Sequence, residues 1–187
     1  MFDALTPRTI RWSPVQGIGL EHLTLRPDAG GIVAESVVIG ERGEKPYGLN
    51  YRIDCDANWC VRAFRIVTTD GRGLALLSDG AGHWRSLGGK PRPEFDGCID
   101  IDLAGTPFTN TLPIRRLELK PDAGTVQLDM LYVPFDDFTP FRDAQRYTCL
   151  RAGRLYRYEA ADRTFAADLP VDEHGVVGDY PTLFRRV

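Results

Sequence analysis

The stretch Cys60-Val61-Arg62-Ala63-Phe64-Arg65-Ile66-Val67-Thr68 divides its side chains into two alternating sets. Successive residues of a β-strand point to opposite faces of a sheet, so this period of two predicts a strand. Both sets are largely apolar, but Arg62 and Arg65 interrupt the pattern. We therefore expect a sheet with one packed face and one face that lines a partly polar hollow.

The same alternation recurs along the chain, for example in residues 23–26 and 126–133, and turn signals rich in Gly, Pro and Asp separate the segments. Many short strands joined by tight turns imply a sheet that must curl, because a flat sheet would leave a face and its edges exposed. The sequence predicts an all-β, mostly antiparallel protein whose curled sheet forms a β-roll or half-barrel. A chain of 187 residues suits one core, so we expect residues 1–187 to form a single domain.

Helical patterns are scarce, and we expect only one or two short helices. A turn or two of helix is predicted within residues 135–145, and a second short turn is expected after Pro181. The strand-turn pattern of residues 23–30 recurs in residues 117–124. This echo indicates either an internal duplication or the general preference of tight turns for Pro-Asp-x-Gly, and we favour the second explanation.

Composition excludes several classes of protein. The net charge is -3 and the basic residues are scattered, which argues against a nucleic-acid partner. The sequence shows no export signal and no apolar run of about 18 residues, so we expect a cytoplasmic protein without stable membrane insertion. The four cysteines should then stay reduced, and their spacing does not match a zinc site. We expect no metal and no cofactor.

The most specific part of the sequence is the segment 98–116. Its first residues alternate as a strand, which places the carboxylates of Asp100 and Asp102 on one face. A loop rich in hydroxyl groups follows, in which Pro107 and Pro113 restrict the backbone. Arg115 and Arg116 end the segment, and in a strand they would point in opposite directions. The conservative interpretation is that one arginine pairs with Asp100 or Asp102.

This segment carries a resemblance to a known family. Together with Trp12, the region of Trp59 and residues 79–84, 145–148 and 171–181, it resembles the signature of the Putative glycolipid-binding family, a bacterial group first defined as a domain of unknown function. Through that family the chain is distantly similar to the half-barrel carriers that localise lipoproteins. The resemblance implies a curled sheet that binds an amphipathic ligand, with a glycolipid as the expected partner.

A glycolipid needs an apolar hollow for its chain and aromatic or polar partners for its head group. The chain supplies both kinds of residue, and we expect binding without catalysis or catalytic residues. The candidate ligand-binding residues come from the segment 98–116 and from positions that the resemblance adds: Trp84, Asp100, Asp102, Thr106, Thr109, Asn110, Arg115, Arg116, Gln145 and Tyr147.

Two alternatives stay open at this stage. The first is a small enzyme that acts on a carbohydrate or nucleotide-like substrate through Asp100, Asp102 and His83, although no nucleophile elbow or phosphate loop accompanies them. The second is a β-scaffold whose exposed strand edge pairs with a second copy to give a homodimer.

Overall fold

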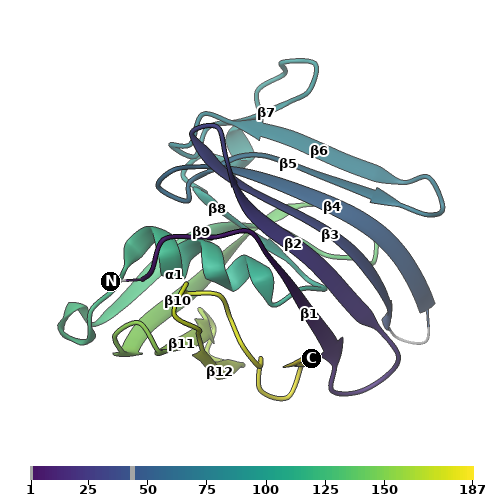
Figure 1. The fold of residues 1–187 in the computed structure, drawn as a ribbon. Coiled ribbons are helices and arrows are strands. Elements are labelled where there is room, and N and C mark those ends of the chain that lie inside the picture. Colours follow the sequence, from purple (N-terminus) through teal and green to yellow (C-terminus); the bar gives the residue numbers. More distant parts are fainter. Residues whose placement is uncertain (1, 43–44) are drawn as a thin grey trace.

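The computed structural model describes residues 2–42 and 45–187, which form two β-sheets (Figure 1). The larger, eight-stranded sheet contains, in spatial order, β13 (Phe184–Arg186), β1 (Arg8–Pro14), β2 (Leu20–Asp28), β3 (Gly31–Arg42), β4 (Lys45–Asp56), β5 (Val61–Thr68), β6 (Gly73–Ser78) and β7 (Trp84–Ser86). The five-stranded sheet contains β12 (Ala166–Pro170), β11 (Leu155–Ala160), β10 (Phe141–Arg151), β9 (Thr125–Val133) and β8 (Asp100–Leu103).

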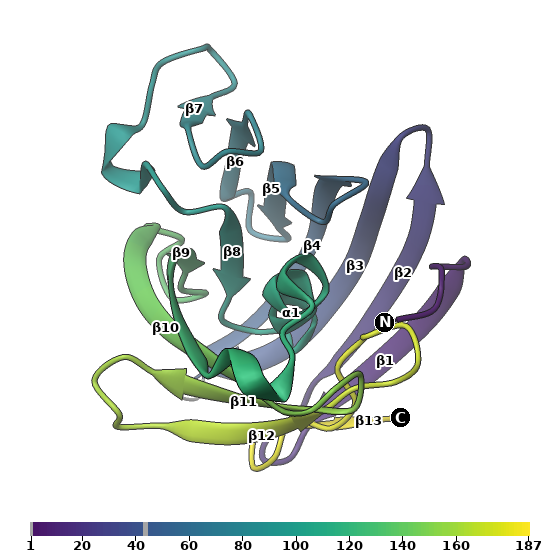
Figure 2. The same ribbon diagram turned by 90° about the vertical axis from the view of Figure 1, so that its left-hand side faces the viewer.

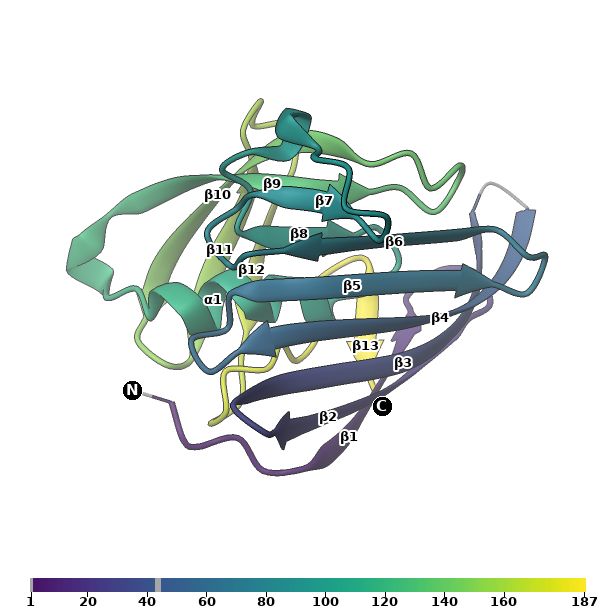
Figure 3. The ribbon, with the colours of Figure 1, turned by 90° about the horizontal axis from the view of Figure 1, so that it is seen from above.

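The larger sheet is an antiparallel meander from β1 to β7, and β13 pairs with β1 as the edge strand on the other side. Figure 3 shows β2 to β6 side by side in one layer, and Figure 2 shows this layer curving around the smaller sheet. In the smaller sheet only β8 and β9 run parallel. Their connection therefore crosses over, through the 3₁₀ turns η2 (Phe108–Asn110) and η3 (Pro121–Ala123) and the helix α1 (Thr111–Leu117). The all-β, curled and mostly antiparallel fold is confirmed.

The concave side of the larger sheet is filled in its middle. Helix α1 lies in the concavity (Figure 2), and Phe108 and Leu112 from this crossover are fully buried in the main core. Strands of the larger sheet contribute Trp12, Ile53 and Phe64 to the same core. Space for a ligand therefore has to be found at the ends of the strands rather than along the whole concavity.

The position of the helix differs from the sequence prediction. Residues 141–151 form β10 and no helix, whereas the helix forms at Thr111–Leu117, in the segment expected to be a loop. Pro113 lies in the first turn, where its missing N–H is not needed, and Glu118 ends the helix with a left-handed φ of 43°. The prediction that Arg115 and Arg116 occupy a strand was therefore wrong. A turn does follow Pro181, at residues 181–183.

The two Pro-Asp-Ala-Gly segments occupy unrelated settings. The first lies in the hairpin between β2 and β3, while the second forms η3 at the end of the crossover to β9. This difference favours turn chemistry over duplication. No helix among the described residues is long and apolar enough to cross a membrane.

Candidate functional site

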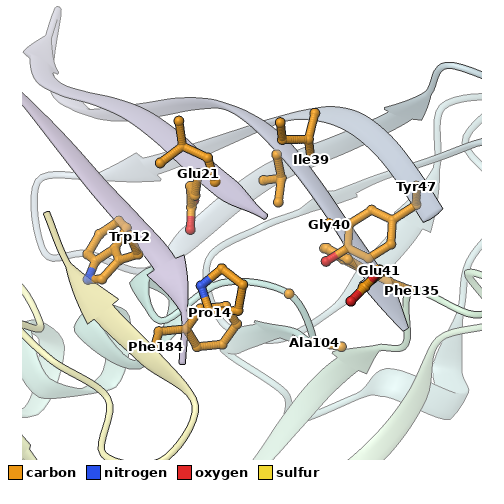
Figure 4. A pocket seen from close by; sticks show the side chains of 13 residues that line it. Trp12, Pro14, Glu21, Ile39, Gly40, Glu41, Tyr47, Ala104, Phe135 and Phe184 are labelled. Carbon is orange, nitrogen blue, oxygen red and sulfur yellow. The ribbon is translucent and has the colours of Figure 1, made fainter. Parts of the chain in front are cut away.

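Two cavities adjoin at one end of the molecule, where the two sheets approach each other. The first, here called the glutamate cavity, has a volume of about 170 Å³. It is bounded by the end of β1, the start of β2, the end of β3 and the loop after β8 (Figure 4). Its lining is Trp12, Pro14, Leu20, Glu21, Val38, Ile39, Gly40, Glu41, Tyr47, Ala104, Gly105, Phe135 and Phe184.

The second, here called the tyrosine cavity, has a volume of about 290 Å³ and faces the smaller sheet. Polar groups of the segment 98–116 line one side and aromatic rings line the other. The lining is Asp102, Leu103, Ala104, Thr106, Asn110, Tyr132, Tyr158, Phe165, Tyr180, Leu183 and Phe184. Ala104 and Phe184 line both cavities, so the two spaces adjoin at these residues.

Glu21 is the buried acid of the glutamate cavity. It shares the inward face of β2 with Leu23 and Leu25, and its side chain is 2% exposed. Its Oε1 accepts hydrogen bonds from the Tyr51 hydroxyl at 2.5 Å and the Ser36 hydroxyl at 3.0 Å. Its Oε2 is buried and has no hydrogen-bond partner among the described residues.

Burial raises the pKa of Glu21 to about 7. The neighbouring hydroxyls of Thr106, Tyr51 and Ser36 act in the opposite direction, because they stabilise the carboxylate. Burial still outweighs them, so an acid that is normally ionised well below neutrality titrates here near pH 7.

Asp102 is the carboxylate of the tyrosine cavity. Its Oδ1 accepts a hydrogen bond from Thr109 Oγ1 at 2.9 Å, and its Oδ2 accepts one from Gln145 Nε2 at 2.7 Å. Burial raises the pKa of Asp102, while these two hydrogen bonds lower it. A carboxylate has about four lone-pair positions, so Asp102 keeps acceptor capacity beyond these two hydrogen bonds.

The other polar residues of this region hold Asp102 and Asn110 in place. The buried Tyr147 hydroxyl donates to Asn110 Oδ1 at 2.9 Å and lies 3.3 Å from Gln145 Oε1. Asn110 Nδ2 donates to the Pro107 carbonyl at 3.3 Å. A network that ties side chains from β8, η2 and β10 together in this way fixes the geometry of the cavity wall.

Five predicted residues thus belong to one region: Asp102, Thr109, Asn110, Gln145 and Tyr147. Thr106 links that region to the glutamate cavity, since its Oγ1 accepts the Phe108 N–H at 3.0 Å and lies 3.5 Å from the Tyr51 hydroxyl. It also lines the tyrosine cavity. The hydroxyl-rich segment therefore contributes to both walls.

Four predicted residues lie elsewhere. Asp100 is 1% exposed and forms a bidentate ion pair with Arg116, with Nη2 2.6 Å from Oδ2, as the conservative interpretation predicted. The guanidinium of Arg115 lies over the rings of Trp59 and Phe2, at 4.8 and 5.0 Å from their centroids. Trp84 is buried against Phe64, with its indole N–H donating to the Cys98 carbonyl at 2.7 Å.

The three residues of the enzyme alternative have separate partners. His83 is exposed and its ring lies 2.8 Å from Asp79, which raises its pKa. Asp100 is committed to Arg116, and Asp102 to Thr109 and Gln145. The structure therefore gives these three residues no shared contact among those described.

Sequence reasoning missed Glu21 and most of the aromatic wall. A signal for Glu21 existed, because the alternation of Leu23 and Leu25 extends back to it and places an acid on a buried face. No comparable signal exists for Tyr132, Tyr158 and Phe165. These rings come from two strands and a loop that only the fold brings together.

The fold and the two cavities define an all-β half-barrel protein with ligand-sized space at one end. Residues 9–186 match the family model described as Putative glycolipid-binding, and the chain belongs to this family. It is also similar to a DUF1089 family protein from Pseudomonas aeruginosa, known from a crystal structure at 1.80 Å resolution. The two chains are 41% identical with a TM-score of 0.79, over 89% of this chain and 92% of the other. No curated protein matches the chain.

Proposed function

We propose that the protein binds an amphipathic ligand of the glycolipid class at the end where the two cavities adjoin. The sugar occupies the tyrosine cavity, and the first part of the apolar chain occupies the glutamate cavity. One observation carries the proposal: a cavity that combines aromatic walls with the polar groups of Asp102, Thr106 and Asn110 shares Ala104 and Phe184 with a mainly apolar one. The family description supports the same class of ligand.

The tyrosine cavity suits a sugar ring. Sugars combine hydroxyl groups with apolar C–H faces, so they are bound by carboxylate or amide groups beside flat aromatic rings. Asp102 and Asn110 supply the polar groups, and Tyr158, Phe165 and Tyr180 supply rings that contact one another at centroid distances of 6.0 to 6.3 Å. Burial of the Asp102 carboxylate strengthens any hydrogen bond that it accepts from a sugar hydroxyl.

The glutamate cavity suits the start of an apolar chain. Trp12, Val38 and Phe135 supply apolar walls, and each buried methylene group contributes about 0.8 kcal/mol. The volume of about 170 Å³ holds only part of a lipid chain. Large apolar side chains are exposed at the strand ends around this cavity, and the rest of the chain would lie over them: Val15, Ile18, Leu20, Ile39 and Leu183.

Calorimetric titration with n-octyl β-D-glucoside, below its micellar concentration, tests this proposal. We expect saturable binding by the wild-type protein. Asp102→Asn should weaken it by about tenfold, the size of one hydrogen bond to a charged group. Tyr158→Leu should weaken it as well, through loss of an aromatic face.

Asp100→Asn is the matched control, because it makes the same chemical change two residues away on β8. Asp100 lines neither cavity, so this variant should lose thermal stability and keep the affinity of the wild type. An equal loss of affinity in both aspartate variants, or no binding by the wild type, would contradict the proposal.

A further inference from the structure

The unpartnered oxygen of Glu21 is the starting point. A buried polar atom without a hydrogen bond is costly, and native proteins keep few of them. Glu21 Oε2 is such an atom, and its carboxyl points into the glutamate cavity (Figure 4). The cavity is otherwise walled mainly by apolar groups, including Trp12, Val38 and Phe135. Glu21 therefore brings one unpartnered polar atom to the edge of this cavity.

The direction of the existing hydrogen bonds decides what this atom offers. The Tyr51 hydroxyl donates a hydrogen bond to Oε1 at 2.5 Å, and the Ser36 hydroxyl donates one to the same oxygen at 3.0 Å. Oε1 therefore acts as the acceptor oxygen of the carboxyl group. When Glu21 is protonated, the proton belongs on Oε2, which then presents an O–H donor to the cavity.

Burial favours the protonated form of Glu21, and the neighbouring groups do not reverse this. Tyr51, on β4, adds no negative charge beside Glu21, because burial raises the pKa of its hydroxyl well above 10 and keeps it neutral. Glu41 and Tyr47 are the other titratable residues of the cavity lining, and the Glu41 carboxylate accepts the Ile18 N–H at 3.2 Å near the exposed rim. Ser36, Thr106 and the side chains of β1 and β13 in the lining carry no charge. No basic side chain lines the cavity among the described residues.

We propose that Glu21 recognises a carbonyl oxygen at the head of the ligand's chain, by donating a hydrogen bond from its protonated Oε2. The protein then prefers acylated ligands, in which an ester carbonyl joins sugar and chain, over alkyl glycosides, which have no carbonyl at that position. This inference rests on the proposed function and names the linkage that the site selects. It also links binding to pH, because the ionised carboxylate loses the donor and repels the carbonyl oxygen.

Two probes that differ in one group test the preference. n-Octyl β-D-glucoside and freshly prepared 1-O-octanoyl-β-D-glucose share the sugar, the anomeric position and the number of chain carbons, but only the second has a carbonyl. At pH 5.5 we expect the wild type to bind the ester about tenfold more tightly, which is the size of one hydrogen bond. At pH 8.0 this preference should largely disappear.

Three variants distinguish Glu21 from its surroundings. Glu21→Met should bind both probes equally at both pH values. Glu21→Gln should keep a preference that no longer depends on pH, because its amide retains an N–H donor but does not titrate. Ser36→Ala should keep the preference at pH 5.5, because of the two Glu21 oxygens Ser36 contacts only Oε1, and the loss of the preference should move to higher pH, because the Ser36 hydroxyl stabilises the carboxylate.

The outcomes separate the two proposals. Failure of both probes to bind contradicts the proposed function itself. Equal binding of both probes by the wild type at pH 5.5, or an unchanged preference in Glu21→Met, overturns the role of Glu21 and leaves the amphipathic site standing.

Discussion

Glu21 is a residue whose burial is unfavourable for the folded protein at neutral pH. Its pKa is raised by burial from 4.5 to about 7, so the folded state holds a proton that the unfolded state has released. Wherever the folded state binds more protons, the free energy of unfolding falls as the pH rises. A side chain kept in a core position at such a cost is typical of a functional group.

We predict a pH-dependent stability difference between the wild type and Glu21→Gln. Well below pH 4.5 the acid is neutral in the folded and the unfolded state, so its ionisation does not change the free energy of unfolding. Between pH 4.5 and about 7 the wild type should lose stability relative to the variant, by roughly 3 kcal/mol in total. Urea unfolding of both proteins at pH 4.5, 6 and 8 measures this difference. Glu41→Gln, at an exposed position, should show no such trend.

At the scale of elements, the crossover between β8 and β9 holds the site together. The ion pair of Asp100 with Arg116 ties the strand to α1, and both side chains are largely buried, at 1% and 14% exposure. A buried pair adds little net stability compared with apolar residues, but removal of one partner leaves an uncompensated charge. The crossover also contains Gly105, at the wall of the glutamate cavity.

Arg116→Met should lower the free energy of unfolding by about 3–5 kcal/mol, because it leaves the Asp100 carboxylate buried without its partner. The double variant Asp100→Leu with Arg116→Met should recover much of this loss. Denaturant unfolding of the two variants measures the difference. A single variant as stable as the wild type would show that the pair is not effectively buried.

Gly105→Ala should destabilise the protein by about 1–3 kcal/mol through overpacking. A Cβ atom at this position would lie 2.3 Å from Cε2 of the buried Phe135 ring, which would have to move. Thermal unfolding measures the effect. Gly88→Ala is the control, since its Cβ would come no nearer than 3.9 Å to a neighbouring atom and should leave the melting temperature unchanged.

At the scale of the whole molecule, the distribution of space decides what can be bound. The crossover helix fills the middle of the concavity, and the two adjoining cavities lie where β1, β2, β3 and β13 meet the loop after β8. A ligand at this end contacts both sheets at once. Binding there should therefore depend on Ala104 and Phe184, which line both cavities.

Ala104→Leu should reduce ligand uptake, because Ala104 lines both cavities and a larger side chain would fill the space beside Phe184. Native mass spectrometry after incubation with n-octyl β-D-glucoside measures the fraction of protein that carries a ligand. Val37→Leu, on an exposed position of β3, should retain the fraction of the wild type. Equal uptake by all three proteins would place the ligand elsewhere.

Much of the fold could be predicted from the sequence, because the alternation of side chains in a strand depends only on local backbone geometry. The strand containing Asp100 and Asp102 and the many antiparallel hairpins follow from it. The helix at Thr111–Leu117 could not be predicted, since it is one short segment with a proline inside it. Its stability comes from the burial of Leu112 and Ile114 and from the pairing of Arg116 with Asp100, which are tertiary contacts.

The sequence by itself determined that this protein is all-β, that its motifs match those of the Putative glycolipid-binding family, and that the segment 98–116 carries its most specific polar groups. Only the tertiary structure decided that Asp102 and Asn110 face a cavity while Asp100 and Trp84 do not. It also decided that one oxygen of Glu21, beside a mainly apolar cavity, has no hydrogen-bond partner within residues 2–42 and 45–187. The physical reason is that a local pattern sets which face a side chain takes, whereas the partners on that face come from strands and loops distant in the chain.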